Sequence, residues 1–183
     1  MKPARMFTIV GTLFALGLAA ATTAGAAEPH PFLKLGVVMN GDYGEPLGFA
    51  DRFVYKGGLD LNLNDLFAIG PEFQYQHLGY DGTVGDVDYS ASENTYTFYG
   101  NGRFAPKVES KVAPFFGAGI GVVHGTAGGT VGDAEFDGFA GTKGAFHAFG
   151  GIVFGTFTAD VEVRRVLADG ASTDALLNFG IRF

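Results

Sequence analysis

Residues 175–183 read ALLNFGIRF. Every second position of this stretch carries a large apolar side chain, and the positions between are mostly polar or Gly. The apolar set is Leu177, Phe179, Ile181 and Phe183. Because successive side chains of a β-strand point to opposite faces, the alternation predicts a strand with one dry face and one polar face. The rest of the sequence indicates what shields this apolar face from water.

The same alternation recurs along the chain after His30, where helical periodicity is almost absent. Eight segments of about ten residues show it. They are FLKLGVVM (32–39), RFVYKGGLDLNLN (52–64), LFAIGPEFQYQHLGY (66–80), TYTFYGNGRF (95–104), VAPFFGAGIGVVH (112–124), AFHAFGGIVFG (145–155), FTADVEVRRV (157–166) and ALLNFGIRF (175–183). A strand that crosses a bilayer at a tilt needs about 9–11 residues. Barrels made from one bacterial chain have an even number of strands.

The connections between these segments alternate in length. Short turns are expected at Asn64-Asp65, at 106–110 and at Gly155-Thr156, and long loops at 40–51, 79–93, 125–144 and 167–174. An open sheet edge cannot exist in lipid, so the eighth strand must pair with the first. The sequence therefore predicts an all-β protein: a closed, antiparallel, eight-stranded, up-and-down transmembrane β-barrel.

Residues 1–26 have the pattern of a cleaved signal peptide. Lys2 and Arg5 precede an apolar run from Met6 to Ala21, and Ala24-Gly25-Ala26 fits the small-residue cleavage site. A retained membrane anchor is the alternative, but the run is shorter than the roughly 20 residues that a spanning helix needs. We therefore expect residues 27–183 to form the mature barrel outside the cytoplasm.

Composition narrows the function classes. The chain has no Cys, so it offers no disulfide framework and no thiol chemistry. Its formal charge is −7 and it has no basic cluster, which argues against a nucleic-acid partner. Charged residues make up only 17%, whereas Gly is abundant at 30 residues, a combination unusual for a soluble domain.

Three stretches resemble a known family. The alternating strand that ends in Phe183 resembles the C-terminal signature of bacterial outer-membrane proteins. PFFGAGIGV (114–122) and TADVEVRR (158–165) resemble strands of small outer-membrane barrels of the OmpA, OmpX and opacity-protein type. The resemblance covers the whole mature chain. It is strong for architecture and weak for any particular activity, because small barrels host many functions.

The resemblance implies a porin-like barrel in the outer membrane of a Gram-negative bacterium. Both ends of the mature chain would be periplasmic and the long loops extracellular. Partners would be membrane lipid, lipopolysaccharide and the barrel-assembly machinery, and the protein would be a monomer. The machinery would read a C-terminal assembly signal formed by Leu177, Phe179, Ile181 and Phe183.

The polar faces of the strands predict a charged barrel interior. The charged inward set is Lys34, Lys56, Asp60, Glu72, Arg103, Asp160, Glu162, Arg164 and Arg182. The interior of an eight-stranded barrel is just wide enough for side chains to fill it. Buried charges must be paired, so we expect a salt-bridge network that plugs the barrel. The glycines at 117, 119 and 121 would leave room for long arginines. A narrow channel for ions or small hydrophobic molecules is the alternative.

Acidic residues concentrate in the four long connections, where Lys143 is the single base. This pattern favours exposed, soluble loops. Alternatively, the loops share divalent cations with lipopolysaccharide or bind a cationic surface ligand. No loop has the ordered ligand spacing of a calcium-binding loop. His124 and His147 should face opposite sides of the sheet. We therefore predict no metal site and no cofactor.

The hypothesis that the chain is an enzyme is the least favoured. A lipid A-modifying enzyme would need a hydroxyl nucleophile, a His base and a carboxylate on adjacent strands. His147 with Glu162 or Asp160 is the candidate, but Ala148 and Phe149 follow the histidine and no serine does. A soluble lipocalin-like barrel is a further rival, with the apolar face inside. We expect a non-enzymatic outer-membrane protein with a structural or surface-recognition role.

Overall fold

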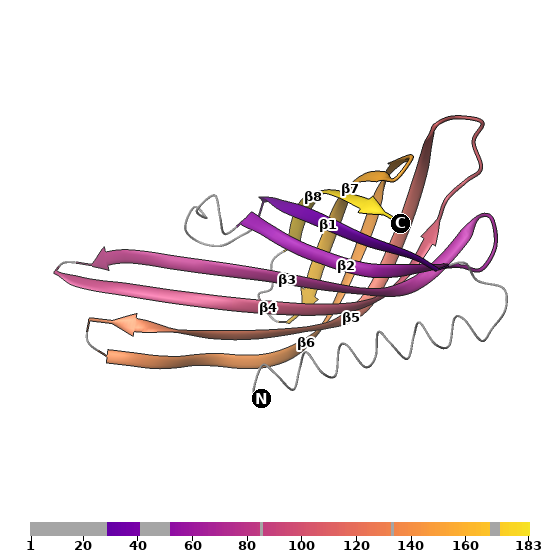
Figure 1. The fold of residues 1–183 in the computed structure, drawn as a ribbon. Helices are drawn as coiled ribbons and strands as arrows, with labels where there is room; N and C mark the ends of the chain where they lie inside the picture. Colours follow the sequence, from indigo (N-terminus) through magenta and orange to yellow (C-terminus); the bar gives the residue numbers. More distant parts are fainter. Residues whose placement is uncertain (1–28, 41–51, 85, 133, 169–172) are drawn as a thin grey trace.

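The structure is a computed structural model that describes residues 29–40, 52–84, 86–132, 134–168 and 173–183. These residues form eight antiparallel strands that close into one barrel (Figure 1). The strands are β1 (Pro29–Asn40), β2 (Phe53–Asn62), β3 (Phe67–Val84), β4 (Val87–Phe104), β5 (Val112–Val131), β6 (Ala134–Phe154), β7 (Phe157–Leu167) and β8 (Thr173–Arg182). The predicted fold class is confirmed. Within the described ranges, no helix is long and apolar enough to span a membrane.

The seam that closes the barrel joins β1 and β8. Phe32 lies opposite Arg182, and the register continues to Val37 opposite Leu177. The backbone N–H of Phe183 also donates to the carbonyl of Pro31 at 2.9 Å. The C-terminal strand β8 is therefore paired on both sides, with β7 and with β1. The expected signal peptide, residues 1–26, lies outside the described residues.

The alternation sorts side chains into an apolar outer face and a polar inner face. On β5, Phe116 is 58% exposed and Ile120 is 76% exposed. On β8, the inward Asn178 is completely buried. A lipocalin-like barrel would have the opposite arrangement, with its apolar face lining a cavity.

Two rows of aromatic side chains lie on the outer face of neighbouring strands. Tyr55, Tyr75 and Tyr96 lie directly across from one another on β2, β3 and β4, with ring centroids 6.4 and 5.2 Å apart. Nearer the short turns, Phe67 of β3 faces Phe104 of β4, with centroids 5.1 Å apart. Along β3, Tyr75 lies eight positions beyond Phe67. The rows therefore mark two levels along the barrel axis.

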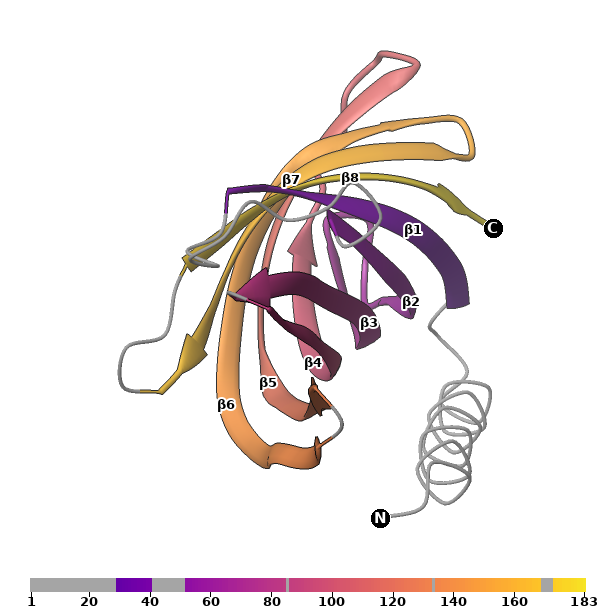
Figure 2. The same cartoon turned by 90° about the vertical axis from the view of Figure 1, so that its left-hand side faces the viewer.

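Two of the four predicted loops are wrong. Residues 79–93 and 125–144 continue as paired strands, except at the tight turns that join Val84 to Val87 and Val131 to Ala134. Because β4 also pairs with β5 as far as Tyr89 opposite Val131, the four strands leave the barrel as one sheet. Figures 1 and 2 show this projecting sheet, which we define as residues 78–84, 86–94, 125–132 and 134–143.

The reason for the error lies in composition. These stretches are rich in Gly, Thr, Ser and Asp and lack apolar alternation, so they read as loops. In the structure, they continue the backbone hydrogen bonds of hairpins that begin inside the barrel. Most of the other two predicted loops, residues 41–51 and 169–172, lies outside the described residues.

Candidate functional site

The barrel interior is crossed by ion pairs between strands that are not neighbours in the sheet. Lys34 of β1 places its Nζ 2.7 Å from Oδ2 of Asp160 on β7, and Asn178 donates to the other oxygen of Asp160 at 2.6 Å. The ammonium group of Lys34 also lies 5.1 Å from the centre of the Phe32 ring, within the range of a cation–π interaction. This lysine is thus held by both charge and aromatic contacts.

A second pair joins Lys56 of β2 to Glu162 of β7, with Nζ 2.6 Å from Oε2. The amide of Gln74 lies between two carboxylates. It donates to Glu72 at 2.6 Å and to Glu162 at 3.1 Å. Asn101 donates to the second oxygen of Glu72 at 3.2 Å. Strands β2, β3, β4 and β7 therefore contribute to one connected network.

His147 lies at the edge of this network and is only 1% exposed. Its ring stacks on Tyr99, with centroids 4.0 Å apart and planes 11° apart. Nε2 is 2.8 Å from Oδ1 of Asn101. Nδ1 is 3.2 Å from Oε1 of Glu162, an ion-pair distance if the ring carries both protons. His124 points outward instead and contacts Thr142 Oγ1 at 2.9 Å, so the two histidines do not converge.

Near the short turns, two arginines share one carboxylate. Arg103 Nη1 lies 3.1 Å from Oδ2 of Asp60, and Arg182 Nε lies 3.6 Å from the same oxygen. Arg182 also donates to Asn62 at 3.3 Å. At the opposite end, Arg164 Nε donates to Asp174 at 2.9 Å.

Asp174 was missed as an interior residue. The sequence places it in the loop 167–174, whereas the structure places it in β8, where it is 9% exposed. The signal was present: Asp174 has the same parity as Leu176 and Asn178 along the strand. A strand start shifted by one or two residues would have found it, because strand boundaries are the least certain part of a pattern.

The expectation that Gly117 and Gly119 make room for arginines is wrong. A Cβ added to Gly119 would overlap Oδ1 of Asn101 and lie 2.5 Å from Nε2 of His147. A Cβ added to Gly117 would overlap the ring of Phe149. These glycines accommodate the amide, imidazole and phenyl groups of the neighbouring strands β4 and β6.

Recesses at both ends flank the charged network. A recess of about 460 Å³ at the short turns is lined by Arg103, Lys107 and Arg182, among others. A second recess, of about 350 Å³, lies where the projecting sheet leaves the barrel and includes Leu78, Val123 and Lys143. Between them, a void of about 20 Å³ touches Lys34, Asp60 and Glu72. This volume suffices for about one water molecule.

The fold matches solved outer-membrane barrels. The match to Ail, the attachment invasion locus protein of Yersinia pestis in complex with the heparin analogue sucrose octasulfate, has a TM-score of 0.58 and 13% identity, and covers 86% of this chain and 99% of that chain. Neisserial surface protein A gives 0.58 and 14%, covering 86% and 97%. The outer membrane enzyme PagL gives 0.52 and 15%, covering 83% and 98%.

The chain therefore has the fold of the small eight-stranded outer-membrane β-barrels. No protein-family model matches the sequence, and no curated protein matches it either. At these sequence identities the likeness concerns the fold and not the activity.

Proposed function

We propose that this chain is an integral protein of a bacterial outer membrane, with a structural and surface-recognition role carried by the projecting sheet. The barrel anchors the protein in the membrane and the projecting sheet presents a surface outside it. The single observation that carries the proposal is the pairing of a closed, apolar-faced barrel with a sheet that continues beyond one end of it.

The aromatic rows support a membrane position. Eight residues at about 3.4 Å each span about 27 Å along a strand. A strand tilt of about 35–45° reduces this to about 20 Å between the Phe67 and Tyr75 rows. Barrels of this class carry an apolar band of about 25 Å between aromatic girdles. We therefore place the bilayer between the two rows and the projecting sheet in water.

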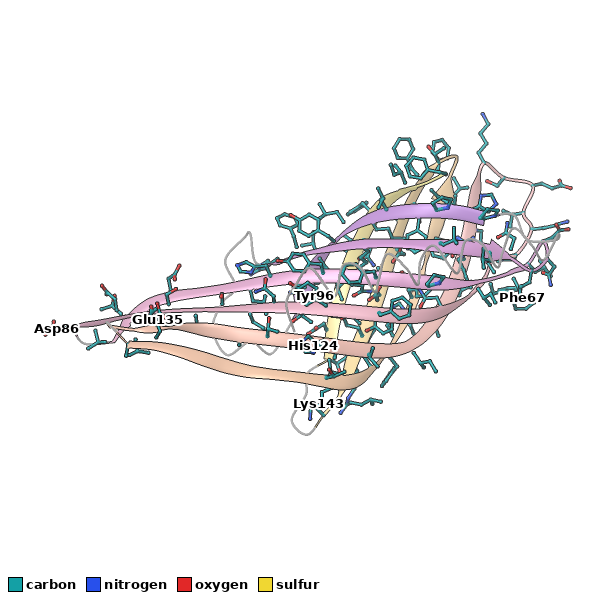
Figure 3. All side chains as sticks on the ribbon, turned by 60° about the horizontal axis from the view of Figure 1, so that its bottom comes forward. Phe67, Asp86, Tyr96, His124, Glu135 and Lys143 are labelled. Atoms are coloured by element: carbon teal, nitrogen blue, oxygen red, sulfur yellow. The ribbon has the colours of Figure 1, made fainter. Side chains whose placement is uncertain are left out.

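The charge of the projecting sheet supports a basic partner. Asp81, Asp86, Asp88 and Glu135 are exposed on it, and Lys143 is the base at its root. Figure 3 shows Asp86 and Glu135 near its tip, at the far end of the molecule from Phe67. Ail, whose fold is similar, is an attachment protein crystallised with an anionic sugar analogue. The acidic sheet of this chain favours instead a lysine- or arginine-rich segment of another protein.

The interior network supports an anchor in preference to a channel. The lumen between the two recesses is occupied by paired charges and by a void of about 20 Å³. We also infer a non-enzymatic role. His147 has a neighbouring carboxylate, but its Nε2 is directed at the amide oxygen of Asn101, where a nucleophile would need to be. Neither β6 nor β7 contains a serine.

The remaining features of the proposal follow from the strand order. We propose that the Phe67 end, which carries the short turns, lies in the periplasm together with both ends of the barrel domain. The strand with Leu177, Phe179, Ile181 and Phe183 would serve as the assembly signal, after removal of a signal peptide at residues 1–26. We expect a monomer in contact with lipid and lipopolysaccharide.

The test shortens the projecting sheet and leaves the barrel intact. In one variant, residues 79–92 and 126–140 are each replaced by Asn-Gly, which joins Leu78 to Glu93 and Gly125 to Gly141, positions that already face each other. Both proteins are refolded in detergent and titrated with a decalysine peptide, with decaglutamate as the control. We expect the full chain to bind decalysine in a salt-dependent way and the short variant to lose at least tenfold in affinity.

Equal binding by the two proteins would overturn the recognition role. The membrane part of the proposal is tested separately. Heat-modifiable migration on SDS gels checks closure of both barrels, and proteinase K on intact cells should cut the projecting sheet but not the short turns at the other end. Cleavage only after the cells are broken would contradict the orientation.

A further inference from the structure

Glu72 differs from the other interior acids in its partners. Among the described residues, Asp60, Asp160, Glu162 and Asp174 each contact a lysine or an arginine. Within the part of the chain that the structure describes, the hydrogen bonds of Glu72 come only from the amides of Gln74 and Asn101. Yet Glu72 is 3% exposed. A buried carboxylate is costly without positive charge nearby.

The missing charge can be located from His147. Glu72, His147 and Glu162 each offer one possible metal-ligand atom, and these three atoms lie within 4.8 Å of one another. All three residues are buried. His147 is 1% exposed, and its Nδ1 has no hydrogen-bond partner although it lies 3.2 Å from Oε1 of Glu162. An unpartnered nitrogen beside two carboxylates needs an explanation.

Hydrogen-bond directions assign the proton of the imidazole. The amide nitrogen of Asn101 must face Glu72, because a carboxylate only accepts. The amide oxygen of Asn101 is therefore the atom that faces Nε2 of His147, and Nε2 must carry the proton. If the ring is neutral, Nδ1 presents a lone pair to the Glu162 oxygen 3.2 Å away. Two lone pairs at this distance repel, and either a second proton on the ring or a metal ion between them removes the repulsion.

The spacing fits a metal ion. Two ligands at about 2.0–2.1 Å from a tetrahedral ion lie about 3.3 Å apart, close to the 3.2 Å between Nδ1 of His147 and Oε1 of Glu162. The ring is also oriented as metal-binding histidines are. Its other N–H donates to a carbonyl oxygen, and its face is fixed by Tyr99. Lys56 binds Oε2 of Glu162, and Oε1, which also accepts from Gln74 at 3.1 Å, faces the histidine.

We propose that Glu72, His147 and Glu162 form a binding site for one divalent transition-metal ion of the Zn²⁺ type inside the barrel. Imidazole nitrogen and carboxylate oxygen together suit Zn²⁺ better than Ca²⁺ or Mg²⁺, which prefer oxygen ligands alone. Glu72 moves toward the ion and exchanges its bond from Gln74 for a bond to the metal. The ion joins β3, β6 and β7 and supplies the positive charge that Glu72 lacks. The proposal is independent of the recognition role.

The test titrates Zn²⁺ into the full chain refolded in detergent and stripped with a chelator, using calorimetry with Ca²⁺ as the comparison ion. We expect one Zn²⁺ per chain. Glu72→Gln and His147→Gln should each weaken binding at least tenfold. His124→Gln and Glu93→Gln are matched controls of the same residue types outside the cluster, and they should change the affinity less than twofold. Heat-modifiable migration checks that each variant is folded.

A second measurement uses the wild-type site, so it does not depend on whether a variant at Glu72 or His147 folds. Nitrogen NMR of histidine-labelled wild type follows His147, assigned by elimination with His30→Gln, His77→Gln and His124→Gln. We expect the Nδ1 signal to move on addition of Zn²⁺ while Nε2 keeps its proton. A ring that carries both protons and does not respond to Zn²⁺ would overturn the site and identify the cation as a proton. Zn²⁺ binding that persists in both Glu72→Gln and His147→Gln would assign it to the acidic surface and would also overturn it.

Discussion

Lys56 and Glu162 meet inside the barrel although their strands, β2 and β7, are separated by β1 and β8 in the sheet. Their Nζ and Oε2 atoms lie 2.6 Å apart, and the side chains are 1% and 3% exposed. The pair therefore connects opposite parts of the barrel wall across the lumen.

Removal of one member of the Lys56–Glu162 pair should lower the free energy of unfolding much more than removal of both. We expect Lys56→Met to lower the free energy of unfolding by about 3–5 kcal/mol, because Glu162 is left as a buried, uncompensated charge. The double variant Lys56→Met/Glu162→Leu should recover most of that loss. Guanidinium unfolding in phospholipid vesicles, followed by circular dichroism, measures both. Lys107→Met, at the exposed pair with Asp65, is the control and should cost less than about 1 kcal/mol. Additive losses in the double variant would contradict this account.

Gly119 should not tolerate even one added methyl group. Its Cβ would overlap Asn101 and crowd His147, so we expect Gly119→Ala to lower the free energy of unfolding by about 1–3 kcal/mol. Gly102 on the outer face of β4 is the matched control, because a Cβ there meets nothing within 4 Å. Gly102→Ala should be neutral or stabilising by about 0.4–1 kcal/mol. The same unfolding measurement decides, and equal effects at the two sites would refute the proposed packing.

The membrane position predicts a depth-dependent cost for charge. Ile120 is 76% exposed and lies midway between Phe116 and His124 on β5. Ile120→Arg should cost about 2–4 kcal/mol at the bilayer midplane, whereas His124→Arg at the interface should cost about 0–1 kcal/mol. Refolding into vesicles across a guanidinium series measures the difference. If both arginines are tolerated equally, the apolar outer face of the barrel does not face lipid.

Conductance separates the plugged barrel from the narrow channel. We expect wild-type protein in planar bilayers to give no steady open-channel current, because ion pairs and a void of about 20 Å³ occupy the lumen between the two recesses. A steady current whose amplitude changes in Lys56→Met/Glu162→Leu would instead show that ions pass through the network.

Much of the fold could be predicted because one rule governs most of it. A barrel that is apolar outside and polar inside repeats every two residues, and the stretch from Leu33 to Met39 shows that period as clearly as the stretch ending at Phe183. The projecting sheet could not be predicted in the same way. Both of its faces are accessible to water, so no alternation marks residues 79–93 or 125–144. Backbone pairing and cross-strand contacts such as that of Thr83 with Asp88 hold these strands together.

The sequence predicts on which face of its strand each site residue lies, but not which of these residues contact one another. Parity along each strand gives the inward side of Glu72, His147 and Glu162. Their proximity depends on the stagger of β3, β6 and β7 around the barrel, which the sequence does not show. The place of His147 beside Asn101 depends on the glycine at 119, whose neighbours belong to two other strands.

The β1–β8 seam has a kinetic consequence. Every other seam joins strands that are consecutive in the chain, so each can form as a local hairpin. The contact between Phe32 and Arg182 must instead close a loop that contains nearly the whole barrel, and the entropy of that loop opposes it until the other strands are in place. This seam therefore forms last, and it is the place where a folding barrel remains open at its side.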